Sequence, residues 1–129
     1  MANDQAAFGS AIYSALGGTA SSPAVYYALA PQGTEPPYVI FQRQAGADEY
    51  TFTSQTVNTE YVVKVVSNRN WPTEARAAYG TVHNTIQNAA LSMTGFTLLR
   101  CERVSTIEYI DPDRYWHVGG IYRIEAEAT

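Results

Sequence analysis

The order of apolar patterns along the chain limits the folds that it can adopt. Two stretches alternate as half-buried strands do, at residues 36–44 and 56–67, and one long stretch with helical spacing follows at residues 72–91. Two more strand patterns come after it, at residues 96–104 and 116–127. The sequence therefore predicts an α+β fold, in which one long helix packs on a mostly antiparallel sheet of four to five strands.

A short helix is expected before the first of these strands. Asp4 can cap this helix, and the Gly17-Gly18 pair ends it. Residues 25–29 are a candidate short strand, and residues 31–37, which include three prolines and a glycine, are expected to form a loop. The apolar residues of the short helix follow helical spacing: Ala7, Phe8, Ala11, Ile12, Ala15 and Leu16.

The strand patterns predict one face that packs against the helix and one that is largely polar. On residues 56–67 the second face also carries Val62 and Val66, so we expect something to cover it. Gly119-Gly120 predicts a bulge or a close backbone approach in the last strand. Outward charges of both signs are expected to form cross-strand pairs: Glu60, Lys64, Arg100, Glu102, Arg123 and Glu125.

Residues 45–55 lie between the first two well-marked strands. The segment is too polar for a buried turn and too long for a tight hairpin, which predicts an extended, mobile hairpin arm. Tyr50 and Phe52 are aromatic residues in this polar segment. Because exposed aromatic side chains often anchor contacts with partners, we expect the arm to become ordered against a neighbouring molecule.

Composition favours a single domain that works by contact. The chain of 129 residues is long enough for one core, so residues 1–129 are expected to form one domain. Charged residues make up only 16%, against about 25% in an average soluble protein. The net charge of −4, without any basic run, argues against a surface that grips nucleic-acid phosphates. No stretch reaches the length of a membrane-spanning helix, so no membrane partner is expected.

Residues that could take part in catalysis or bind a metal are few and scattered. The single cysteine, Cys101, excludes an internal disulfide and is expected to be buried on the same side of its strand as Leu99. His83 and His117 lack further ligands at metal-binding spacing. Glu108, Asp111 and Asp113 are interpreted as part of a polar turn. We therefore predict no catalytic, cofactor-binding or metal-binding residues, and no enzyme.

Several stretches of the sequence resemble a known family. They are "PPYVIFQ", "TEYVVKVVS", a helix entered through "PTEARAAYGTVHNTI", then "FTLLRCERVS", "DPDRYWH" and "GGIYRIEAE". Together they resemble the tail completion or tail terminator proteins of long-tailed bacteriophages and related particles. The resemblance runs from about Phe8 to Glu127, with residues 19–35 matching only loosely.

The resemblance implies a structural virion protein without a cofactor. Six copies would form a ring at the head-proximal end of the tail, assembled in the host cytoplasm. The ring would cap the tail tube, end its polymerisation and offer a joining surface to the head. Its implied partners are other copies of the chain, the tail tube protein, the head-tail connector and the tape-measure protein, with DNA only as cargo passing through.

Two further interpretations remain open at this stage. The chain could be a head-tail connector or a tail-tube subunit, and a tube subunit would form long stacks where a terminator stops at one ring. It could instead be a small-ligand binding domain, which a dry pocket lined by Tyr26, Tyr27, Tyr50 and Tyr115 would favour. In the ring interpretation the expected interface residues are Arg43, Tyr50, Phe52, Lys64, Arg76 and Arg123.

Overall fold

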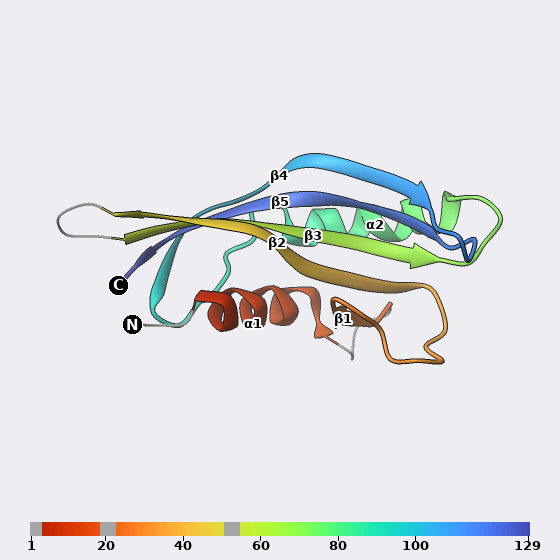
Figure 1. The fold of residues 1–129 in the computed structure, drawn as a ribbon, viewed down its shortest axis with the longest axis horizontal. Coiled ribbons are helices and arrows are strands. Elements are labelled where there is room, and N and C mark those ends of the chain that lie inside the picture. The colour runs from red at the N-terminus through yellow and green to blue at the C-terminus, as the bar shows by residue number, and fades with distance from the viewer. Residues whose placement is uncertain (1–3, 19–22, 51–54) are drawn as a thin grey trace.

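The protein is an α+β fold with a five-stranded, mostly antiparallel sheet, as the sequence predicted. The computed structural model describes residues 4–18, 23–50 and 55–129 (Figure 1). In chain order the elements are α1 (Asp4–Leu16), β1 (Val25–Tyr27), β2 (Tyr38–Tyr50), β3 (Gln55–Ser67), α2 (Thr73–Ile86), β4 (Phe96–Ile110) and β5 (Trp116–Ala128).

The strands lie in the order β1-β2-β3-β5-β4. β1 runs parallel to β2, and every other neighbouring pair is antiparallel. The centre of the sheet is therefore the pair β3 and β5, which are far apart in the sequence, while β4 forms one edge (Figure 1). β2 and β3 continue as a paired hairpin up to Tyr50 and Gln55, so much of the predicted arm is a two-stranded extension of the sheet.

Both helices pack on one face of the sheet. α2 contacts β3 and β5, and α1 lies beside α2 and β1. The ring of Phe8 from α1 meets the ring of Phe96 edge-on, with centroids 5.3 Å apart. Alternate residues of β3 and β5 point into this core, including the fully buried Tyr61 and Tyr122. Among the residues that the structure describes, no helix covers the opposite face of the sheet.

The two helices are similar in length, 13 and 14 residues, whereas the sequence predicted one long and one short helix. α2 ends at Ile86, before the predicted end at residue 91. The chain leaves the helix because the next two residues bind β4. The side-chain oxygen of Gln87 accepts a hydrogen bond from the N–H of Arg103 at 2.9 Å, and the N–H of Asn88 donates to the carbonyl of Cys101 at 2.8 Å.

A bulge in β4 corrects one expectation about its faces. Cys101 is buried at 3% exposure, as predicted, but Leu99 is 54% exposed and does not lie on the same side. The pairing of β4 with β5 shifts register between Leu98 and Arg100, and an extra residue in one strand reverses the alternation beyond it. The prediction that Leu99 and Cys101 share one side assumed a regular strand without this bulge.

The glycine pair in β5 permits the close approach that the sequence predicted. A Cβ atom on Gly119 would collide with the backbone of β3 at Val63 and Lys64. A Cβ atom on Gly120 would collide with the hydroxyl of Tyr79, which reaches the sheet from α2. These two residues therefore let β5 lie close to β3 on one side and to α2 on the other.

Candidate assembly surface

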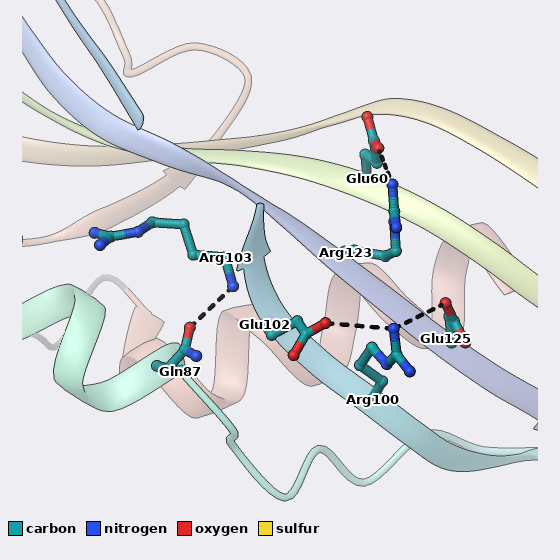
Figure 2. Close-up of polar contacts among 7 residues, drawn as sticks. All are labelled: Glu60, Gln87, Arg100, Glu102, Arg103, Arg123 and Glu125. Carbon is teal, nitrogen blue, oxygen red and sulfur yellow. Dashed lines mark hydrogen bonds and ion pairs between the residues drawn. The ribbon is translucent and has the colours of Figure 1, made fainter. Parts of the chain in front are cut away.

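A row of paired charges crosses the sheet face that the helices leave uncovered (Figure 2). The guanidinium of Arg123 on β5 lies 3.3 Å from the carboxylate of Glu60 on β3. Arg100 on β4 pairs with Glu102 at 3.4 Å and with Glu125 on β5 at 3.8 Å. The predicted cross-strand pairing is thus confirmed for Glu60 with Arg123 and for Arg100 with Glu125, whereas Glu102 lies on the same strand as Arg100. Since ion pairs at this degree of exposure stabilise a fold only weakly, the row mainly makes the face polar.

A second polar cluster lies on this face, near the turn between β4 and β5. The ammonium of Lys64 donates to the Tyr109 hydroxyl at 2.9 Å, and the Tyr109 ring stacks on His117 with centroids 4.6 Å apart. The Nε2 atom of His117 lies 2.8 Å from a carboxylate oxygen of Asp111. The cluster therefore fixes the turn against β3, β4 and β5.

Asp111 is the residue that organises this turn. Its other carboxylate oxygen accepts backbone N–H bonds from Asp113 and Tyr115, both at 2.9 Å. Burial acts to raise the pKa of Asp111, but the bonds from His117 and the backbone outweigh it and lower the pKa. Of the acidic group that the sequence placed in a turn, the Asp111 carboxylate therefore holds the turn together. Glu108 lies apart from it, in β4.

The expected interface residues lie on different surfaces. Lys64 and Arg123 share the uncovered face, where their partners are Tyr109 and Glu60. Arg76 projects from α2 and forms a bidentate ion pair with Glu108, in which Nε and Nη2 donate to the two carboxylate oxygens at 2.6 and 2.9 Å. These contacts lie within one chain, and the role of the residues between copies stays a prediction.

The remaining three expected interface residues belong to β2 and the arm. Arg43 lies on β2 opposite Tyr61. Tyr50 is the last residue of β2, and Phe52 lies outside the described residues. Among the expected residues that the structure describes, Lys64 and Arg123 share one face, and Arg76 lies on a helix at the other face.

The side chains best suited to react or to bind a metal are instead part of the core. Burial raises the pKa of the Cys101 thiol to about 11, which disfavours the reactive thiolate. The Tyr122 hydroxyl lies 2.6 Å from the Tyr79 hydroxyl and 2.8 Å from Nδ1 of His83. Within residues 4–18, 23–50 and 55–129, no three His, Cys, Asp or Glu side chains are grouped to hold a metal ion.

An open groove of about 770 Å³ lies between α1 and the chain after α2. Small side chains line it, Ala7, Ser10 and Ser14 among them, and none of its lining residues is a tyrosine. Tyr27 instead lines a separate hollow with Tyr13 and Phe41. The groove thus lacks the tyrosine lining that would favour a small-ligand site.

Sequence reasoning missed the exposed apolar residues at the edge of the sheet. Val104 is 42% exposed, Tyr109 44% and Ile110 48%, and all three belong to β4. The predicted strand ended at Val104, whereas β4 continues to Ile110. The β-branched and aromatic residues just before the Asp111-Pro112-Asp113 turn were the signal for this longer strand.

Comparisons with known proteins agree with this fold. A family model described as "Tail completion protein gp17" matches residues 10–124. A solved chain from "Virion of native gene transfer agent (GTA) particle" superposes with a TM-score of 0.84, covering 96% of this chain and 97% of its own length. At 20% sequence identity, this likeness shows a shared fold. No curated protein matches the sequence, and neither described helix is long and apolar enough to span a membrane.

Proposed function

Because the chain belongs to the tail completion protein gp17 family, as its sequence indicated, we propose that it caps the tail tube of a phage-type particle. Six copies form a ring at the head-proximal end of the tube. One ring face binds the last tube ring and ends polymerisation, and the other face offers a joining surface to the head-tail connector. The tape-measure protein sets the length at which this happens, and DNA passes through the ring.

The family match over residues 10–124 is the observation that carries this proposal. The structure is consistent with it, because each subunit has two unlike surfaces. One sheet face is covered by α1 and α2, and the other carries the row of ion pairs. A ring needs such a subunit, since one surface of each copy must meet a different surface of the next. The chain of similar fold comes from a virion of the gene transfer agent type.

A particle stock that lacks this protein tests the proposal. Each added tube ring presents the same acceptor surface as the ring before it, so an uncapped tube keeps growing. We expect overlong or irregular tails that are not attached to filled heads, measured by electron microscopy. Purified protein added early should restore a defined tail length, and the same protein added after the tubes have grown should not.

Other outcomes would assign other functions. Tails of normal length that are merely detached from heads would make the protein a connector. Long stacks formed by the purified protein alone would make it a tube subunit. Normal infectious particles would exclude all of these virion functions.

A further inference from the structure

The edge of the sheet formed by β4 is covered near the middle of the strand and open beyond it. The outer side of β4 at Cys101 and Arg103 is occupied by the chain after α2, through Asn88 and Gln87. Figure 2 shows the bond between Gln87 and Arg103. The register of β4 against β5 shifts between Arg103 and Ser105, and beyond this bulge residues 105–110 pair with β5 on one side only. In the part of the chain that the structure describes, nothing pairs with their other side.

The direction of the free N–H groups follows from the turn. The N–H of Asp111 donates to the carbonyl of Tyr115 at 2.9 Å, towards β5. In an antiparallel ladder alternate residues point the same way, so Tyr109 and Ile107 also point towards β5. The N–H groups of the residues between them therefore face outward, and these are Thr106, Glu108 and Ile110.

Apart from the bulge at its start, this open edge lacks the usual protection. Natural edge strands avoid pairing with other chains by means of proline, lysine, bulges or a covering segment. Residues 104–110, Val-Ser-Thr-Ile-Glu-Tyr-Ile, contain neither proline nor lysine. Their single charge, on Glu108, is paired with Arg76. The segment is rich in β-branched residues and suited to accept one more strand.

The same chain carries a second open edge on β2. β1 pairs only with residues 39–41, and the register of β2 against β3 shifts between Arg43 and Ala45. Beyond this bulge, residues 45–50 pair regularly with β3 on one side. None of the residues placed by the structure pairs with the other side. The two open edges are of similar length and lie at opposite sides of the sheet.

We propose that residues 45–50 of one copy add as a strand to residues 104–110 of the next copy. This inference rests on the proposed ring. We call this contact between neighbouring copies the joint. A second copy is the occupant that fits, because in a closed ring every copy donates one edge and accepts one, which covers both of these open edges at once. Residues 45–50 lie at the end of the sheet near Tyr50 and Gln55, and residues 104–110 lie at the other end, near the β4–β5 turn. Pairing them shifts each copy along the strands relative to the next. The ring can therefore close only if the strands are tilted to its axis, as in a barrel.

A proline at the acceptor edge tests the joint. Thr106→Pro removes an outward N–H without touching a bond to β5, and proline is tolerated on an edge strand in this position. Thr106→Ala is the matched control, because it keeps the N–H. We expect Thr106→Ala to form rings like the natural sequence, and Thr106→Pro to weaken subunit association by roughly tenfold or more, measured by analytical ultracentrifugation.

Mixing two blocked variants shows whether the contact is head-to-tail. Deletion of residues 48–53 removes much of the donor edge but leaves β4 intact, while Thr106→Pro leaves the donor intact. At a concentration where the natural sequence forms rings and Thr106→Pro does not, each variant alone should stay monomeric, and the mixture should stop at dimers that contain one copy of each. Dimers formed by the deletion variant alone would instead indicate a β4–β4 contact and overturn the inference.

Hydrogen exchange gives a readout that does not depend on variant folding. In rings of the unaltered protein, free or bound to tail tubes, the amides of Thr106, Glu108 and Ile110 should exchange far more slowly than in the monomer. Equally fast exchange in rings would overturn the joint and leave the proposed function standing. Rings of Thr106→Pro that form normally but fail to bind tube or connector would overturn the joint and assign the edge to that partner. Absence of rings, both free and on tubes, would refute the proposed function itself.

Discussion

The hydroxyl of Tyr122 holds a buried polar network that joins α2 to the centre of the sheet. It bonds to Tyr79 and His83, and Arg103 donates to the Tyr79 hydroxyl at 3.3 Å. Removing one member leaves buried polar atoms without a partner. We expect Tyr122→Phe to lower the free energy of unfolding by about 1–3 kcal/mol, measured by urea denaturation. The control Tyr109→Phe removes only the exposed hydrogen bond from Lys64 and keeps the ring that stacks on His117, so it should lower the free energy of unfolding by less than about 0.5 kcal/mol.

His83 makes this network sensitive to acid. Burial and the nearby positive charge of Arg103 lower the pKa of His83 below its ordinary value. The folded protein therefore binds fewer protons at this site than the unfolded chain, so the stabilisation is full above the ordinary pKa and is lost as the pH falls. We expect the free energy of unfolding to decrease as the pH is lowered from neutral through the ordinary pKa of histidine. His83→Gln should flatten this dependence, and an unchanged slope in that variant would contradict the prediction.

At the scale of elements, the contact between β5 and β3 depends on the absence of a side chain. Gly119→Ala would force a methyl group into the backbone of β3, so we expect the free energy of unfolding to fall by about 2 kcal/mol or more. Gly80 in α2 is exposed, and a methyl group added there would meet no other atom within 4 Å. Gly80→Ala should therefore stabilise the protein by about 0.5–1 kcal/mol. A neutral Gly119→Ala variant in urea denaturation would show that the strands can separate at little cost.

Local patterns predicted the elements better than their ends. Alternating apolar residues placed β3 and β5 within one residue of their bounds, because their two faces differ along their whole length. The end of α2 could not be predicted, since Gln87 and Asn88 leave the helix to bind a strand that comes later in the sequence. The exposure of Leu99 depends on a bulge, which alternation alone does not reveal.

At the scale of the whole molecule, the candidate surface was predictable in its charges but not in its edges. Outward residues of opposite sign on adjacent strands indicated pairs such as Glu60 with Arg123, and the structure contains them. Whether a strand is central or peripheral depends on strand order. The sequence did not reveal that β5 inserts between β3 and β4, and it is this order that leaves residues 104–110 at the margin.

The central position of β5 also sets when a newly made chain becomes a subunit. Val63 on β3 pairs with Gly120 on β5, across all of α2 and β4. The β2–β3 and β4–β5 hairpins pair residues that are near in the sequence, whereas joining them requires closing a long loop, so we expect this joining to be the slow step of folding. β5 is the last described strand to leave the ribosome. A nascent chain therefore cannot complete its sheet until β5 has been made.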